Sequence, residues 1–166
     1  MTTTCRPWAP SPRTACTRRS GCPSSAQSIE TTDYLVTRTG ETGSWLGQRF
    51  QGQGIGTAMR QAICAFAFDH LDATEVTSGA FFDNPASLAV SRKVGYRDNG
   101  VRRLRRRTDE LAVNRMLLLA PEEFVRGPHP LRVEGVEAFR RSIGLASVSS
   151  PTHESACRAA AYALGW

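Results

Sequence analysis

The chain has 166 residues, of which 40% are hydrophobic and 22% are charged, an ordinary composition for a single soluble domain. No apolar stretch approaches the length of a membrane span, and no apolar signal segment follows the first residues, so we expect a cytoplasmic protein without a membrane partner. The formal net charge is +6, but residues 1–29 contain four arginines and no acid. Most of the excess charge therefore lies in this segment, which leaves the rest of the chain without the general basicity of a nucleic-acid-binding domain.

Residues 1–32 are rich in Thr, Ser, Pro, Arg and Cys and show no apolar periodicity. Such a segment buries too little apolar surface to offset the entropy of ordering it. We expect a disordered tail here, and a segment translated out of frame or from a misplaced start is the alternative. Three of the five cysteines lie in this tail, at spacings that match no zinc site. Cys64 lies in an apolar helical pattern, so we expect a core residue and no metal.

Order is expected to begin near Tyr34, with one strand over 34–37 and 44–46 that Gly40 and Gly43 interrupt. A glycine-bearing turn follows at 48–56. Apolar residues at helical spacing, from Ile55 to Phe66, then predict a helix over about 54–71.

The second half of the chain predicts one further helix and three strands. Residues 75–82 are typical of a buried strand that places Phe81 and Phe82 in the core. Residues 84–94 predict a helix in which Asp83 or Asn84 forms the cap, Pro85 occupies the first turn and Gly95 ends it. Two strands, 101–107 and 111–119, are joined by a turn at 108–110, and a short helix spans 121–124. We expect a weakly ordered C-terminal tail over 146–166.

The turn before the first helix combines glycines with a helix start, which suits a pyrophosphate because backbone amides and the helix dipole both face the anion. A Walker loop would need a lysine that is absent here, and the glycine spacing fails the Rossmann pattern in both frames. Gln51, Gly54 and Gly56 fit Gln/Arg-x-x-Gly-x-Gly/Ala, so the segment resembles the GNAT N-acetyltransferase superfamily. An ordinary glycine-rich connection is the alternative reading of this turn.

A second motif lies about thirty residues on, and it carries the same resemblance. Asn84 and Ser87, followed by Lys93, Gly95 and Tyr96, are similar to the signature of members that modify ribosomal proteins or protein N-termini. The resemblance implies an α/β (α+β) fold, a partial GNAT fold over 33–145 with a mixed, mostly antiparallel sheet and helices on both faces. We expect Lys93 and Gly95 to be structural and Tyr96 to pack beneath the sheet.

The resemblance also implies acetyl-CoA as co-substrate and a set of site residues. Ser87 matches the position that protonates the leaving thiolate, with an exposed helix serine as the alternative. Glu41 is a candidate base because it is the one acid between Asp33 and Asp69. Asn84 matches a position that contacts coenzyme A, with a helix cap as the alternative. The cofactor-binding residues implied are Leu46, Gln51, Gly52, Gln53, Gly54, Ile55, Gly56, Thr57 and Asn84.

The family usually places three strands and two helices before the strand that leads into the glycine turn, and this chain has room for far less. The N-terminal half of the family fold would then be missing or replaced, and residues 44–46 would form an exposed edge through which two copies could dimerise. We expect an enzyme that transfers acetyl from acetyl-CoA to a primary amine, a protein N-terminus or a small molecule, by direct attack. The alternatives are a truncated, non-catalytic fragment that binds CoA weakly or not at all, and a small arginine-rich nucleic-acid-binding module built on 101–107.

Overall fold

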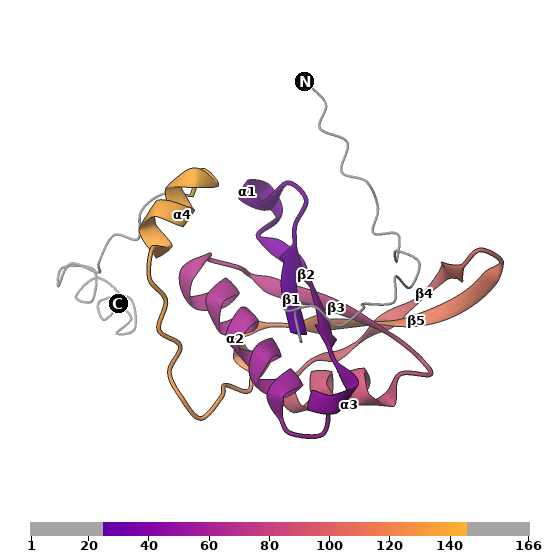
Figure 1. Cartoon of the computed structure of the whole chain (residues 1–166). Helices are drawn as coiled ribbons and strands as arrows, with labels where there is room; N and C mark the ends of the chain where they lie inside the picture. The colour runs from indigo at the N-terminus through magenta and orange to yellow at the C-terminus, as the bar shows by residue number, and fades with distance from the viewer. Residues whose placement is uncertain (1–24, 146–166) are drawn as a thin grey trace, which may run out of the picture.

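A computed structural model describes residues 25–145 of the chain (Figure 1). Five strands form one sheet in the order β1-β2-β3-β5-β4. The strands are β1 (Ser25–Glu30), β2 (Thr39–Leu46), β3 (Glu75–Phe81), β4 (Arg97–Arg107) and β5 (Glu110–Leu119). The helices are α1 (Tyr34–Thr37), α2 (Ile55–His70), α3 (Pro85–Val94) and α4 (Val136–Ser142), with 3₁₀ turns η1 (Gln48–Phe50) and η2 (Pro121–Glu123).

The sheet is mixed and mostly antiparallel, as the resemblance to the GNAT superfamily implied. Strands β2 and β3 run parallel, and the other three neighbouring pairs are antiparallel. The parallel pair needs a crossover, and α2 supplies it. No helix in the described part of the chain is long and apolar enough to cross a membrane.

Both longer helices, α2 and α3, cover the same face of this sheet (Figure 1). Val76 and Ala80 on β3 alternate with their neighbours and point to one side, where they meet Leu117 and Leu119 of β5. We expected helices on both faces. Within residues 25–145 the apolar alternation instead directs the core, and with it both helices, to one face.

Strand β1 corrects the expectation that order begins near Tyr34. Residues Ser25–Glu30 pair with residues 41–46 of β2, from Ser25 opposite Leu46 to Glu30 opposite Glu41. Pairing satisfies the backbone of a polar strand without any apolar periodicity, and Ile29 alone packs against the core. Because β1 covers β2, residues 44–46 are not an exposed edge, and the dimer predicted through that edge loses its basis. The rest of the predicted N-terminal tail, 1–24, and the predicted C-terminal tail, 146–166, lie outside the described residues.

The segment Tyr34–Thr37 is a helical turn and not a strand. It is flanked by two residues with positive φ, Asp33 at 52° and Arg38 at 49°, which reverse the chain between β1 and β2. The Tyr34 hydroxyl donates to the carbonyl oxygen of Leu71 at 2.9 Å, so the turn is fixed to the end of α2. Tertiary contact has overridden the β-propensity of Val36.

The predicted elements from residue 54 to residue 124 are confirmed to within a few residues. Helix α3 ends at Gly95, whose φ of 105° lets its amide reach back to carbonyls of the last turn. The strands β4 and β5 are joined at 108–109 as predicted. Helix α4 was not predicted, and it is positioned by contacts distant in sequence, including Phe139 against Phe66 with ring centroids 5.9 Å apart.

A buried polar network lies in the core between α2 and the sheet. The Thr42 hydroxyl donates to the Thr77 carbonyl at 3.1 Å, so it accepts from the Tyr96 hydroxyl, 2.8 Å away. The Cys64 thiol lies 3.3 Å from the same hydroxyl. The predicted core positions of Cys64 and Tyr96 are thereby confirmed, and each has a polar partner.

This network predicts that the protein loses stability in alkaline solution. Burial raises the pKa of the Cys64 thiol above its ordinary value of 9.0, and contacts with Tyr96 and Arg60 offset this only in part. Burial raises the pKa of Tyr96 above its ordinary value, and the neighbouring Cys64 raises it further. Above pH 9 the unfolded chain therefore releases protons that the folded chain retains. The free energy of unfolding should fall with pH, by at most about 1.4 kcal/mol per pH unit for each proton retained.

Urea unfolding of the wild type between pH 7 and pH 10.5 measures this slope. The variant Cys64→Ala removes one of the two groups and should show a shallower decline above pH 9 than the wild type. Equal slopes in the two proteins would contradict a buried neutral thiol at position 64.

Candidate functional site

The two central strands stop pairing with one another partway along the sheet. Pairing between β2 and β3 ends at Thr42 opposite Ser78. Beyond that point β2 stays paired with β1 as far as Leu46, and β3 stays paired with β5 as far as Phe81. On the sides that β2 and β3 turn toward each other, the backbone groups past this point have no strand partner. The sheet is therefore open there, toward the start of α2.

The glycine turn lies directly after this opening. Gly52 and Gly54 adopt positive φ, at 76° and 79°, and Gly54 is the N-cap of α2. The Gln51 side-chain amide donates to the Leu46 carbonyl at 3.0 Å, and Gln53 donates to the Arg49 carbonyl at 3.1 Å. The two glutamines thus hold the loop in shape, and only glycine adopts its two left-handed positions without strain.

The backbone amides of residues 52–57 have no protein acceptor within the described ranges, in contrast to Gln51, whose amide donates to Gln48. Three of them form the first turn of a helix of 16 residues. Unpaired amides and the positive end of the helix dipole therefore lie together. This arrangement suits a phosphate or another anion.

A cavity of about 350 Å³ lies between the glycine turn, the end of β2 and one side of α3. Eight of the predicted residues line it: Leu46, Gln51, Gly52, Gly54, Gly56, Thr57, Asn84 and Ser87. Six further residues that were not predicted complete its wall: Ser44, Arg60, Ala86, Ala89, Val90 and Lys93. The two motifs, about thirty residues apart in sequence, thus face a single cavity.

Three predicted residues do not line the cavity. The side chain of Gln53 is used within the loop, and Ile55 turns to another side of α2. Glu41 lies on β2 at a position that alternates with Ser44 and Leu46, so its side chain points to the opposite face of the sheet. Any action of Glu41 on a ligand would therefore come from that opposite face.

Asn84 and Ser87 form the helix start at the cavity wall. The Asn84 side-chain oxygen accepts a hydrogen bond from the Ser87 amide at 3.1 Å. Asn84 is therefore a helix cap, the role that we gave as the alternative to contact with coenzyme A. Ser87 is half-buried and lines the cavity. Its hydroxyl is placed where it could donate a proton to a bound group.

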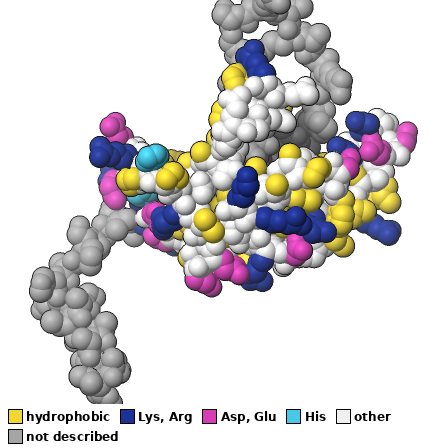
Figure 2. Space-filling model, turned by 90° about the horizontal axis from the view of Figure 1, so that it is seen from below, with side chains coloured by type: hydrophobic (Ala, Val, Ile, Leu, Met, Phe, Trp, Pro, Cys, Tyr) yellow, Lys and Arg dark blue, Asp and Glu magenta, His cyan; other side chains and the backbone are white. Residues whose placement is uncertain are grey.

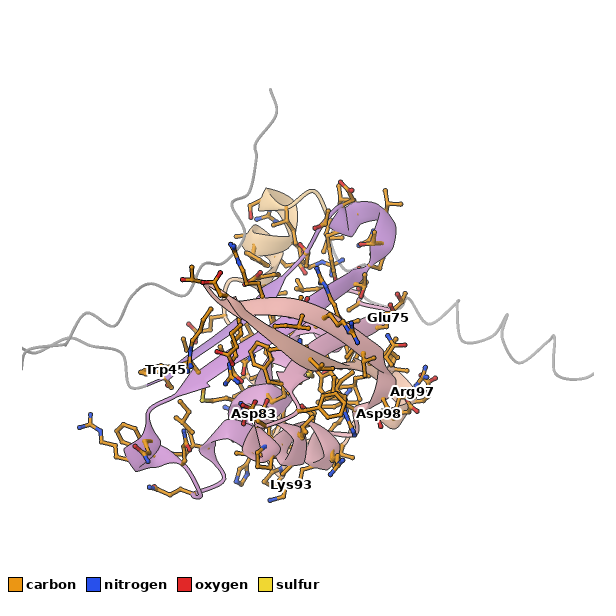
Figure 3. The ribbon with its side chains drawn as sticks, turned by 90° about the vertical axis from the view of Figure 1, so that its right-hand side faces the viewer. Trp45, Glu75, Asp83, Lys93, Arg97 and Asp98 are labelled. Atoms are coloured by element: carbon orange, nitrogen blue, oxygen red, sulfur yellow. The ribbon has the colours of Figure 1, made fainter. Side chains whose placement is uncertain are left out.

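The charge of the cavity wall is positive. None of the described residues that line it is acidic, whereas Arg60 and Lys93 are cationic. Lys93, expected to be structural, projects from the end of α3 (Figure 3). The cavity therefore favours an anionic ligand.

Arg60 was not singled out from the sequence, although a local signal for its burial exists. It lies four residues before Cys64 and seven before Ala67, a spacing that places all three on one face of α2. Cys64 and Ala67 are fully buried, and Arg60 is buried with them. The apolar partners at these spacings could have indicated that its side chain points inward.

Two of the five arginines in the run 101–107 form ion pairs with acidic side chains. Arg106 pairs with Asp83 at 2.6 Å and lies over the Phe81 ring, and Arg107 pairs with Glu110 at 3.2 Å. Figure 2 shows basic and acidic side chains interspersed on the underside of the molecule. Within residues 25–145 there is also no group of His, Cys, Asp and Glu able to hold a metal ion.

Comparisons with known proteins agree with this geometry. Residues 19–97 match the family described as "Acetyltransferase (GNAT) domain". The chain is 35% identical over 81 residues to "Putative ribosomal N-acetyltransferase YdaF" of Bacillus subtilis (strain 168), a match that covers 49% of this chain and 42% of that protein. The chain thus spans less than half the length of this curated relative.

Solved structures show the same fold. One, titled "Crystal structure of Probable acetyltransferase", is 26% identical with a TM-score of 0.56, and the match covers 63% of this chain and 59% of that one. Another, RimJ of Mycobacterium smegmatis in complex with CoA-disulfide, has a TM-score of 0.55 at 20% identity and covers 76% and 57%. At that identity the likeness to RimJ is one of fold. Residues 19–97 are therefore similar to a GNAT acetyltransferase domain, and the chain resembles a ribosomal-protein acetyltransferase over about half of its own length.

Proposed function

We propose that this chain binds acetyl-CoA in the cavity beside the glycine turn and transfers its acetyl group to a primary amine. One observation carries the proposal: the amides of residues 52–57 are unpaired within the described residues, and four of these residues, Gly52, Gly54, Gly56 and Thr57, line a cavity without acidic lining. The diphosphate of the cofactor would be held by these amides and by the start of α2. The CoA-disulfide bound to RimJ, which shares this fold, supports the same ligand class.

Acetyl-CoA supplies an activated carbonyl, so that the C–N bond to the amine forms as the C–S bond breaks. The chain must then accept the proton that the amine loses and provide one for the thiolate. We propose Ser87 as the donor to the thiolate, because its hydroxyl is at the cavity wall. We propose Glu41 as the acceptor of the amine proton, acting from the opposite face of the sheet through the opening past Thr42.

The predicted cofactor residues fall into two groups: those that would contact the cofactor directly and those that would hold the loop and the helix start in place. Gly52, Gly54, Gly56 and Thr57 would act through their amides, and Leu46 through the end of β2. Gln51, Gln53 and Asn84 would act by holding the loop and the helix start in place. The acceptor amine would be a protein N-terminus, as the ribosomal names of the relatives suggest, or a small molecule.

Thermal unfolding of the 166-residue chain with and without acetyl-CoA tests the binding step. At a ligand concentration one hundred times Kd the stabilisation is about 2.7 kcal/mol, which for a domain of this size raises Tm by several degrees. ADP at the same concentration is the control for diphosphate binding alone and should give a smaller shift. A folded protein whose Tm does not respond to acetyl-CoA would contradict the proposal.

A second candidate is a domain that binds CoA without turnover. The match covers only 42% of YdaF, and turnover would fail if the acceptor site needs the part of that protein with no matched counterpart here. Release of free CoA thiol, followed with a thiol reagent in the presence of peptide and small-molecule amines, separates the two. Thermal stabilisation without amine-dependent thiol release would support this second candidate.

A further inference from the structure

One cationic side chain at the cavity has no role in the proposal above. Arg60 is 2% exposed and is held under the opening between the two central strands. Its guanidinium donates to the Ser44 hydroxyl from β2 and to the Ser78 hydroxyl from β3, both at 2.9 Å. Since β2 and β3 stop pairing at Thr42 and Ser78, Arg60 lies where they begin to separate.

Arg60 has no countercharge in the described part of the chain. Other arginines of this domain pair with carboxylates, as Arg126 does with Asp69 and Arg106 with Asp83. The partners of Arg60 are two neutral hydroxyls and the face of the Tyr96 ring, 5.7 Å away. Its Nε atom is buried and has no hydrogen-bond partner among residues 25–145.

A buried charge without a countercharge is unfavourable, because its hydration is lost and neutral groups replace it only in part. A structural tie between Ser44 and Ser78 would require hydrogen-bond donors but no charge. The guanidinium also contributes to the wall of the cavity, where no acidic residue offsets it. The missing negative charge therefore points to a ligand.

The position of Arg60 separates it from the phosphate site. It lies six residues past Gly54, which corresponds to about 9 Å along the axis of α2. The amides of the glycine turn are at the helix start, and Lys93 is at the far end of α3. A coenzyme A thioester anchored by its diphosphate at the turn would approach Arg60 with the arm that leads from its phosphates to the thioester.

We propose that Arg60 selects a carboxylate on the transferred group, so that the donor is the coenzyme A thioester of a dicarboxylic acid. This rests on the part of the function proposed above by which the cavity binds a coenzyme A thioester, and it replaces acetyl-CoA with a donor that carries a free carboxylate. The amine nitrogen forms a bond to the thioester carbonyl carbon, the C–S bond breaks, and the CoA thiol gains the proton that the amine loses. The distal carboxylate is unchanged by the reaction and stays paired with the guanidinium.

Calorimetric titration of the 166-residue chain with four thioesters tests the proposal. Malonyl-CoA and succinyl-CoA carry a terminal carboxylate, whereas propionyl-CoA and butyryl-CoA match their chain lengths without it. Each acidic ligand should bind about tenfold more tightly than its neutral match, which is the value of one charge-assisted hydrogen bond. This comparison uses the wild type alone and does not depend on the folding of any variant.

The variant Arg60→Met should bring the ratio of acidic to neutral affinity close to one. Arg60→Lys keeps the charge without the planar fork and should give an intermediate ratio. Arg103→Met removes an exposed arginine that does not line the cavity and should keep the wild-type ratio.

The outcomes separate this inference from the proposed function. If free CoA and all four thioesters fail to bind, the proposed function itself is wrong. If CoA binds and the acidic and neutral thioesters bind equally, the dicarboxylic donor is excluded and Arg60 is a tie between strands. A preference that persists in Arg60→Met would likewise overturn the assignment to this residue.

Discussion

Replacing Gly56 with aspartate is expected to abolish coenzyme A binding while the domain stays folded. Gly56 lies in the first turn of α2, and a Cβ there would meet only Val90 at 3.7 Å and Leu46 at 3.9 Å, ordinary contact distances. An acidic residue in the first helical turn interacts favourably with the helix dipole, so the folded state should not be weakened. The same carboxylate would stand beside the proposed diphosphate site.

The size of the effect follows from electrostatics. Two unit charges 4 Å apart repel by about 4 kcal/mol in the effective dielectric of a protein surface, which corresponds to a loss of more than a hundredfold in affinity. The matched variant Gly56→Asn has the same shape without the charge and should lose far less. Calorimetry with CoA, together with urea unfolding of both variants, measures the two effects separately. Equal CoA affinity in Gly56→Asp and Gly56→Asn would place the phosphates elsewhere.

Replacing Gly95 with alanine is expected to destabilise the domain more than the same replacement at any other glycine of residues 25–145. Gly95 has a φ of 105°, and an added Cβ would overlap the carbonyl oxygen of Glu123. The neighbouring chain cannot move away easily, because the Val125 amide donates to the Val94 carbonyl at 2.9 Å. Backbone strain and overlap together should lower the free energy of unfolding by about 3 kcal/mol or more.

Gly100 provides the matched control for this variant. Its φ of 90° is similar, but nothing lies within 4 Å of an added Cβ. Gly100→Ala therefore measures backbone strain alone and should lower the free energy of unfolding by about 1 kcal/mol. Urea unfolding of both variants gives the difference, and a Gly95→Ala variant no less stable than Gly100→Ala would contradict the close approach of Glu123.

The parts of the fold that local chemistry determines could be predicted from the sequence. Helix α3 is delimited by Asn84, Pro85 and Gly95, whose side chains or backbone freedom act within one turn of the chain. The turn at residues 51–56 was predictable for the same reason, since it needs glycines at positive φ. Both motifs of the candidate site belong to this class, which explains why they were found.

The parts that depend on contacts distant in sequence could not be predicted. Strand β1 has no apolar pattern of its own and exists through its pairing with β2. Phe82 was expected in the core but is 48% exposed, because β3 ends at Phe81 and the next side chain turns outward. The charge on Arg60 concealed its burial, since a lone arginine on a helix is usually at the surface.

Because the pairing between β2 and β3 ends at Thr42 and Ser78, the two strands belong to separate ladders beside the cavity. Past Thr42, β2 stays paired with β1 and β3 stays paired with β5, and the one described cross-link between these two ladders is Arg60. A ligand that hydrogen-bonds to both strands would replace the backbone pairing that β2 and β3 lack there. Binding of the ligand would then complete the hydrogen bonding between the two strands. The folded protein would become more rigid when the ligand is bound.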